Sequence, residues 1–405
     1  MRLIAISQIN LTIAVSILIA TSLGNHIQVD DGFSDDIYCE DISTFAALIE
    51  NSFFEAHEIE TSDHYLVKIF RVQNKPSEVS HDLKVPKKTV LLIHGVLDSA
   101  DEFVLGDKSI VKALLERDYD VWLLNSRGNK YSCAHTQISP KSPDFWDYSF
   151  EGMAEGDFKS TLEFVSEHTK EKVVVIGHSQ GTTQVFAALS SFPDLQDKVE
   201  KFMALAPVVH MTGFDPGNWY YFGSTHNFLQ LAKSLGYYKL LERPLNNNWF
   251  EDSLIRMFCG SLHWICDFII SKMTDRDPNM IDTDEMNSYL KHNPSRTNIK
   301  SLEHFSQMIA NYQGGLRKFD YGKEENVKRY GTSEPPLYDM SVIKTRVYMY
   351  YGDNDLLSTL ENAKLLKQQL KHATGRIYPD WGHLSFFLGK ERQMFVEHLL
   401  EDISE

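Results

Sequence analysis

Short apolar runs alternate with stretches of helical spacing along most of the chain. The runs occupy residues 89–93, 118–124, 173–176, 202–209 and 346–351. A run this short and this apolar is typical of a strand that is buried on both faces, as in a parallel sheet. Helical spacing separates the runs, for example at 156–168 and 360–370. The alternation predicts an α/β fold, with a mostly parallel central sheet and helices on both of its faces.

The two ends of this pattern differ from its middle. Residues 57–72 alternate between apolar and polar positions, which predicts a hairpin of two strands. Before it, residues 44–54 have the spacing of a helix. At the other end, we expect a last strand at 376–378 and a closing helix at 393–403.

The alternation of strand and helix stops between residues 211 and 339. This stretch is rich in aromatic residues and has helical spacing at 229–241 and 301–312. An insertion at this position in such a sheet is expected to lie above Ser179 as a cap or lid; the alternative is an insertion that merely packs. We therefore expect a core formed by residues 25–210 and 340–405, with residues 211–339 as the cap.

The first residues have the features of a secretory signal peptide. Arg2 is followed by an apolar core at 13–20 and then by small residues, which is the pattern of a cleaved signal. The alternative is an anchor that stays in the membrane. Gln8 and Asn10 break the apolar run well short of the ~20 residues that a span needs, so we expect residues 1–24 to be removed. No other segment resembles a transmembrane helix.

Composition narrows the class of protein. The 405 residues are 42% hydrophobic and 24% charged, which indicates a globular chain. The formal net charge of −16 argues against nucleic acid and anionic membrane surfaces as electrostatic partners. Four cysteines are too few for a disulfide scaffold. The sequence leaves the oligomeric state open.

The stretch 177–181 reads Gly-His-Ser-Gln-Gly and follows the apolar run 173–176 directly. Small and apolar residues at helical spacing come after it. Strand, G-x-S-x-G and helix together form the context of a nucleophile elbow, in which the serine projects from a strained turn. The five-residue pattern alone is weak, and an ordinary turn that contains serine is the alternative. With this context, the sequence predicts Ser179 as a nucleophile.

A second turn predicts the groups that would stabilise an oxyanion. The run 89–93 ends in His94-Gly95, where the glycine lets the chain turn sharply. In folds with this elbow, the oxyanion hole uses the backbone N–H after the nucleophile and one from this earlier loop. We therefore expect the N–H groups of Gln180 and Val96 to serve. An ordinary turn is again the alternative.

Serine is a weak nucleophile unless a base takes its proton. The order expected in this architecture is Ser, then Asp or Glu, then His. His383 lies in the last loop after the last predicted strand, where the base belongs. Asp353 and Asp355 both lie in the turn after the preceding strand, and spacing alone does not separate them.

At this point the chain resembles the acid lipases, the animal group that contains gastric lipase and lysosomal acid lipase. The resemblance covers most of the chain from His57 onward. It rests on His94-Gly95, Val121-Trp122, Asn125-Ser126-Arg127-Gly128-Asn129, Phe145-Trp146-Asp147, the pentapeptide at 177–181, Ala204-Leu205-Ala206-Pro207, His292-Asn293-Pro294, Gly352 with Asn354-Asp355, and Gly382-His383.

The resemblance implies an α/β-hydrolase fold with a helical cap, a serine ester hydrolase that acts on neutral lipid esters at a lipid–water interface, and no metal or cofactor. By family position, the acid is Asp355. The family commonly has aspartate two residues after the catalytic histidine, where this chain has Ser385. That departure concerns how His383 is supported.

The family also carries a cap disulfide, which falls here on Cys259 and Cys266. The two are close in sequence, and the expected compartment is oxidising. Cys39 and Cys133 are not assigned by the sequence and either pair or stay free.

Two other functions remain beside a secreted lipase. One is a non-catalytic lipid-binding or storage protein on the same scaffold, and the other is a carboxylesterase for small esters. The sequence does not separate triacylglycerol from cholesteryl ester. The only N-glycosylation triplet begins at Asn10, inside the predicted signal, and Pro294 blocks Asn293 as an acceptor. We therefore expect an unglycosylated extracellular enzyme, with the lysosome as the alternative location.

Overall fold

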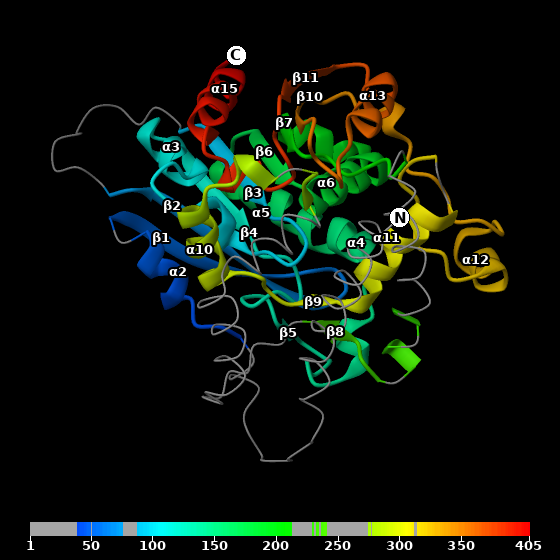
Figure 1. Ribbon diagram of the computed structural model, residues 1–405. Helices are drawn as coiled ribbons and strands as arrows, with labels where there is room; N and C mark the ends of the chain where they lie inside the picture. Colours follow the sequence, from blue (N-terminus) through cyan, green and yellow to red (C-terminus); the bar gives the residue numbers. More distant parts are fainter. Residues whose placement is uncertain are drawn as a thin grey trace, which may run out of the picture.

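The computed structural model describes residues 39–49, 51–75, 87–212, 229–230, 232–234, 236–240, 274–276, 278–311 and 314–405. A nine-stranded sheet runs through the molecule (Figure 1), in the order β1-β2-β4-β3-β6-β7-β10-β11 with β5 beside β2. The strands are β1 (Ser52–Glu60), β2 (Tyr65–Asn74), β3 (Thr89–Ile93), β4 (Asp120–Leu124), β5 (Ala134–His135), β6 (Val173–His178), β7 (Val199–Leu205), β10 (Arg346–Gly352) and β11 (Ala373–Tyr378). From β4 to β11 every pairing along that order is parallel, whereas β1, β2 and β5 pair antiparallel.

The helices of the core are α2 (Ser43–Leu48), α3 (Ile110–Glu116), α4 (Phe150–Gly152), α5 (Lys159–Thr169), α6 (Gln180–Ser191), α13 (Leu360–Gln369), α14 (Ser385–Leu388) and α15 (Arg392–Ser404). Within 211–339 lie α10 (Thr283–His292), α11 (Ile299–Asn311), α12 (Lys323–Tyr330), and the small sheet of β8 (Lys239–Leu240) and β9 (Thr297–Asn298). Short 3₁₀ helices are η2 (Ala100–Phe103), η3 (Pro143–Trp146), η5 (Pro193–Lys198), η6 (Pro278–Met280) and η7 (Met340–Val342), and η4 (Met153–Phe158) is π-helical.

Alternating side chains of the central strands divide the core into two layers. On β6, Val173 and Val175 face one layer, while Val174 and Ile176 face the other. The first layer holds apolar side chains of α5, α6 and α13, and the second holds those of α3 and α15. The period-2 direction of strand side chains explains why both faces of this sheet must be apolar. The predicted α/β fold is confirmed.

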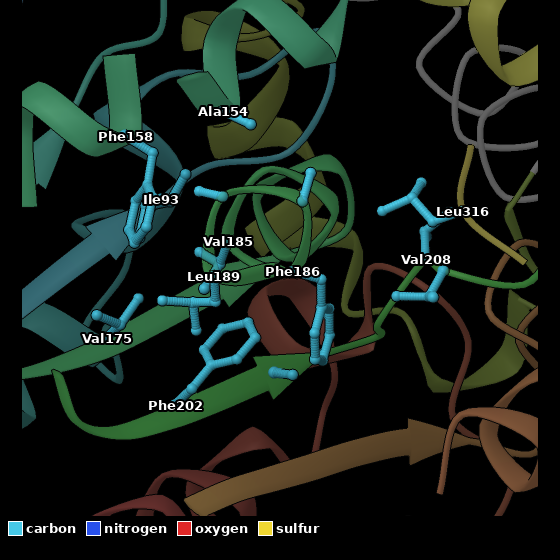
Figure 2. Packing of buried hydrophobic residues seen from close by; sticks show 14 of the residues in the cluster. Ile93, Ala154, Phe158, Val175, Val185, Phe186, Leu189, Phe202, Val208 and Leu316 are labelled. Atoms are coloured by element: carbon cyan, nitrogen blue, oxygen red, sulfur yellow. The ribbon is translucent and has the colours of Figure 1, made fainter. Parts of the chain in front are cut away.

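Helix α6 packs tightly on the sheet directly below the predicted nucleophile. Val185, Phe186 and Leu189 are completely buried and point from α6 toward Val175 and Phe202 (Figure 2). The rings of Phe186 and Phe202 meet edge to face, with centroids 4.9 Å apart, a favoured arrangement for aromatic pairs. This packing fixes the direction of the helix that begins immediately after Ser179.

Two element predictions differ from the structure. The predicted helix at 44–54 ends at Leu48, because Ser52 already pairs with Asn74 at the start of the β1–β2 hairpin. The helix expected at 229–241 gives way to strand β8, where Lys239 pairs with Asn298. In both places hydrogen bonding to a distant strand overrides local helical spacing.

The four cysteines fall in different parts of the chain. Cys39 and Cys133 form a disulfide that joins the segment before α2 to the loop after β4, with their Cα atoms 5.6 Å apart. Cys259, Cys266 and the predicted signal segment 1–24 lie outside the described residues, so the cap disulfide stays a prediction. Within the described ranges, no helix is long and apolar enough to cross a membrane.

Candidate active site

Ser179 lies on the turn between β6 and α6, in a conformation that few residues other than glycine adopt. Its φ is 49° and its ψ is −117°, which stores backbone strain. The turn is held because the Ser179 N–H donates to the Leu205 carbonyl on β7, at 3.0 Å. The tight turn projects the hydroxyl above the carboxyl end of the sheet.

The two glycines of the pentapeptide allow the close approach that this turn needs. A Cβ on Gly181 would lie 2.2 Å from the Ile93 carbonyl oxygen at the end of β3. A Cβ on Gly177 would lie 3.1 Å from the backbone of Gly181. Helix α6 therefore approaches the end of β3 more closely than any side chain permits.

Three predicted side chains meet above the sheet. The Oγ of Ser179 is 2.8 Å from Nε2 of His383, and Nδ1 of His383 is 2.8 Å from Oδ2 of Asp355. They come from the ends of β6, β11 and β10, and all three are buried. Nucleophile, base and acid are thus in hydrogen-bonding contact, which is the geometry that activates a serine.

The two candidate acids lie in different surroundings. Asp355 is buried, and its second oxygen accepts the backbone N–H groups of Leu357 and Ser358, at 2.7 and 2.8 Å. Asp353 is exposed and accepts the Asp380 N–H at 2.7 Å. Of these two aspartates, only Asp355 hydrogen-bonds to the His383 ring. Burial disfavours a charged ring at His383, but the Asp355 carboxylate outweighs it and raises the pKa of His383 above its ordinary value.

The loop that carries Val96 is fixed by a buried histidine. Nδ1 of His94 donates to the Gly95 carbonyl at 2.7 Å, and Nε2 accepts the backbone N–H of Ser126 at 3.0 Å. Burial lowers the pKa of His94 to about 4, so the ring is neutral and keeps these roles. Val96 follows in the turn, and Gln180 opens α6, where first-turn N–H groups have no partner inside the helix. Both predicted oxyanion donors therefore belong to the two turns at this edge of the sheet.

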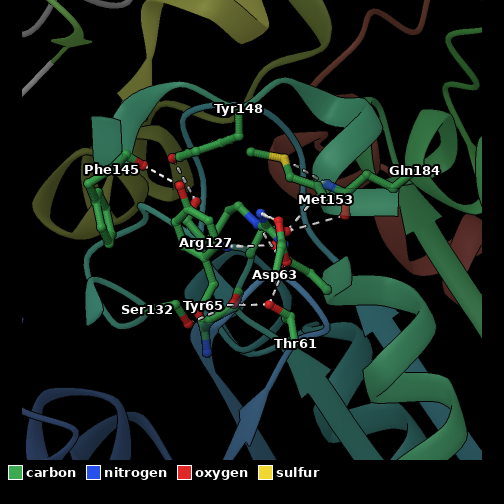
Figure 3. A network of polar contacts seen from close by, with 12 residues as sticks. Thr61, Asp63, Tyr65, Arg127, Ser132, Phe145, Tyr148, Met153 and Gln184 are labelled. Atoms are coloured by element: carbon green, nitrogen blue, oxygen red, sulfur yellow. Dashed lines mark hydrogen bonds and ion pairs between the residues drawn. The ribbon is translucent and has the colours of Figure 1, made fainter. Parts of the chain in front are cut away.

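The polar loop after β4 supports the site from the side. Arg127 is buried, and its guanidinium donates to Asp63 at 2.5 and 2.9 Å and to Asp157 at 2.7 Å (Figure 3). The guanidinium also lies 3.9 Å from the centre of the Tyr65 ring, and the Tyr148 hydroxyl donates to the Arg127 carbonyl. These contacts join the hairpin, the loop and the π-helical turn η4, and they hold the backbone of Ser126 against His94.

Sequence reasoning did not identify Asp275, which lies in the predicted cap. Its Oδ1 accepts the backbone N–H of His383 at 2.7 Å, and its backbone pairs with that of Asp355. Burial, together with the neighbouring Asp355, raises the pKa of Asp275 to about 7. A Cβ on Gly382 would collide with this carboxylate. The contact joins segments far apart in the chain, so local spacing carries no sign of it.

The described residues contain no cluster of three or more histidine, cysteine or acidic side chains placed to hold a metal ion. A cavity of about 140 Å³ is lined by Trp146, Lys233, Tyr238 and Ile299, among others. None of Ser179, Asp355 and His383 lines it. This cavity is therefore separate from Ser179.

Comparison with known proteins agrees with this geometry. A family described as "alpha/beta hydrolase fold" matches residues 88–390, and one described as "Partial alpha/beta-hydrolase lipase region" matches residues 50–107. Mouse lipase member K is 29% identical over 349 residues, which cover 84% of each chain. Bovine gastric triacylglycerol lipase is 30% identical over 344 residues, covering 82% of this chain and 83% of its own.

Among solved structures, E-2-(acetamidomethylene)succinate hydrolase is similar with a TM-score of 0.50 at 13% identity. The match covers 87% of this chain and 100% of that chain. At this identity the likeness concerns the fold alone. The family matches and the sequence relatives identify the family as well as the fold. The chain belongs to the gastric and lysosomal acid lipase family, and it is a lipase with the α/β-hydrolase fold.

Proposed function

We propose that the protein hydrolyses neutral lipid esters through a serine acyl-enzyme. His383 takes the proton of the Ser179 hydroxyl as Oγ attacks the ester carbonyl. His383 then gives that proton to the leaving alcohol, and a water molecule hydrolyses the acyl-enzyme by the same route. Asp355 orients the ring and stabilises its charged form. The proposal rests on one observation, the chain of two 2.8 Å contacts that links Ser179, His383 and Asp355.

The negative charge that develops on the carbonyl oxygen needs donors in place before the reaction. We assign this role to the backbone N–H groups of Val96 and Gln180. The positive end of α6 supports the second of these, because helix N-termini favour negative charge. The packing of α6 on the sheet sets the direction of the Gln180 N–H.

Substitution of the triad tests the mechanism. Ser179→Ala should lower kcat by about 10⁴-fold or more while the protein stays folded. Asp355→Asn should be similarly crippled, and Asp353→Asn, which changes an exposed neighbour, is the matched control. Near-normal esterase activity of Ser179→Ala would support a non-catalytic lipid-binding role instead. A stronger effect of Asp353→Asn than of Asp355→Asn would move the acid.

The proposed substrates are triacylglycerol or cholesteryl ester at a lipid–water interface. The names of the gastric triacylglycerol lipase relatives support this class, as does the aromatic-rich stretch at 211–339. We propose that this stretch is a cap over an apolar tunnel. Each buried methylene contributes about 0.8 kcal/mol, so kcat/KM should rise with acyl length. A profile that peaks at acetyl esters would favour the carboxylesterase.

We also propose that residues 1–24 direct the chain into the secretory pathway and are removed. The enzyme is then extracellular, with the lysosome as the alternative. Since the only N-glycosylation triplet begins at Asn10, endoglycosidase treatment of the native protein should not change its mobility. A shift would contradict the processing, and immunolocalisation to lysosomes would contradict the location. The predicted bridge between Cys259 and Cys266 is tested by alkylation without reduction, because a reactive Cys259 excludes it.

A further inference from the structure

Glu102 lies in η2, seven residues after Gly95, and its side chain is completely buried. One carboxyl oxygen accepts the backbone N–H of Gly95 at 3.2 Å. The other oxygen is 3.1 Å from Nδ1 of His178, the residue before Ser179. A single side chain thus contacts both the turn that carries Val96 and the turn that carries the nucleophile.

His178 extends this contact to the third loop of the site. Its Nε2 is 3.3 Å from the backbone carbonyl of His383. A carbonyl only accepts hydrogen bonds, so Nε2 carries a proton. Burial lowers the pKa of His178 to about 3, and the ring is therefore neutral, with Nδ1 left as an acceptor. The Glu102 carboxyl must then donate to it.

The surroundings of Glu102 favour that protonated form. Burial raises the pKa of Glu102 to about 8. Asp98 lies beside it, hydrogen-bonds to it, and is itself held neutral, because burial and the neighbouring Glu102 carboxyl raise the pKa of Asp98 well above its ordinary value. The hydroxyl of Tyr289 in α10 donates to Asp98 at 2.5 Å. The titratable groups that interact with Glu102 or His178 are Asp98, Tyr289, His94, His383 and Asp355.

These contacts form a chain of hydrogen bonds between neutral groups, and the chain ends at the backbone carbonyl of His383. Tyr289 donates to Asp98, Asp98 shares a hydrogen bond with Glu102, Glu102 donates to His178, and His178 donates to the His383 carbonyl. On its other side, the backbone N–H of His383 is held by Asp275. Each buried group in this chain of hydrogen bonds needs its neighbour, because an unsatisfied buried polar group is costly.

We propose that Glu102 is a positioning residue that aligns the turn carrying Val96 with Ser179 and, through His178, with the loop of His383. The proposal rests on the catalytic roles proposed above for Ser179, Val96 and His383. Glu102 contacts neither substrate nor reacting atoms. It acts by fixing the distance between the oxyanion donors and the base.

Two substitutions separate this role from simple packing. Glu102→Gln keeps the shape, the acceptor for the Gly95 N–H and a donor toward Nδ1 of His178. Glu102→Leu keeps the approximate volume and removes both hydrogen bonds. Glu116→Leu, at an exposed position on α3, is the control for an added leucine. The readouts are kcat and KM on a soluble p-nitrophenyl ester over a pH range, thermal unfolding, and labelling of Ser179 by a fluorophosphonate.

Glu102→Leu should lower kcat by about 100-fold with little change in KM, since a misplacement of ~1 Å costs this much. Glu102→Gln should keep kcat close to that of the wild type. In the wild type, kcat should fall above pH ~8 as Glu102 ionises, and Glu102→Gln should remove this fall.

A folded Glu102→Leu with wild-type kcat would overturn the proposal, as would a Glu102→Gln variant as impaired as Glu102→Leu. If Glu102→Leu does not fold, the pH profile of Glu102→Gln decides, and a profile identical to that of the wild type overturns the proposal. Ser179→Ala, measured in parallel, separates a failure of the proposed catalytic function from a failure of the proposed role of Glu102. Its full activity would refute the catalytic assignment itself, whereas an inactive Ser179→Ala beside a fully active Glu102→Leu refutes only the role of Glu102.

Discussion

Replacement of Gly181 by alanine tests how closely the site depends on the approach of α6 to β3. The new Cβ would lie 2.2 Å from the Ile93 carbonyl oxygen and 2.9 Å from that of His94. Ordinary contacts begin at 3.4 Å, so the start of α6 must move by roughly 1.2 Å. Both obstacles are backbone atoms of the strand end that leads to Val96, and neither can rotate away. Alanine gains at most about 1 kcal/mol over glycine in helix propensity, which does not offset a clash of this depth.

Because α6 carries the Gln180 N–H and follows Ser179 directly, a shift of this size should lower kcat by about 100-fold or more. The assay is hydrolysis of a soluble p-nitrophenyl ester, with urea unfolding to measure stability and fluorophosphonate labelling to count competent serines. Gly314→Ala is the matched control, since nothing lies within 4 Å of its added Cβ. If Gly181→Ala kept wild-type kcat, the inferred dependence of the oxyanion turn on this close approach would be refuted.

Three further predictions concern stability. Arg127→Met leaves Asp157 buried without its cation and should cost about 3–5 kcal/mol in urea unfolding; a loss below 1 kcal/mol would show that the pair is dispensable. The native state holds a proton on Glu102 that the unfolded chain releases, so the free energy of unfolding should fall as the pH rises from about 4.5 to about 8. Glu102→Gln should reduce that slope, and an unchanged slope would contradict the assignment. Joint replacement of Cys39 and Cys133 by alanine should cost about 2–4 kcal/mol in calorimetry, and an unchanged stability would contradict a stabilising role of the bridge.

The features that the sequence predicted correctly are those with a local pattern. The strand at 173–176 and the pentapeptide after it are read from consecutive residues, and the structure places Ser179 on the strained turn that this pattern indicates. The order of serine, acid and histidine along the chain led to the proposed triad, whose assignment stays a prediction. Spacing left Asp353 and Asp355 equivalent, because both lie in one turn, and only the folded chain separates a buried side chain from an exposed one.

The features that the sequence did not predict depend on contacts between distant segments. Nothing near Glu102 in the chain indicates that it meets His178, and nothing near Asp275 indicates that it meets His383. The shortened helix at 43–48 has the same cause, since its expected continuation is taken by pairing with β2. Pairing between distant strands overrides local helical propensity wherever the two favour different structures.

The order of strands in the sheet has a consequence for which part of the lipase tolerates changes in length and sequence. Strands β7 and β10 are neighbours, with Leu205 opposite Tyr350, although residues 211–339 lie between them in the chain. The sheet therefore fixes both points between which that stretch runs: the chain leaves after the carboxyl end of β7 and returns at the amino end of β10, where Arg346 lies opposite Lys201. Lengthening a loop between fixed ends costs little, about 0.6 kcal/mol for each doubling. This stretch can consequently be exchanged or rebuilt while the strands that carry Ser179, Asp355 and His383 keep their register.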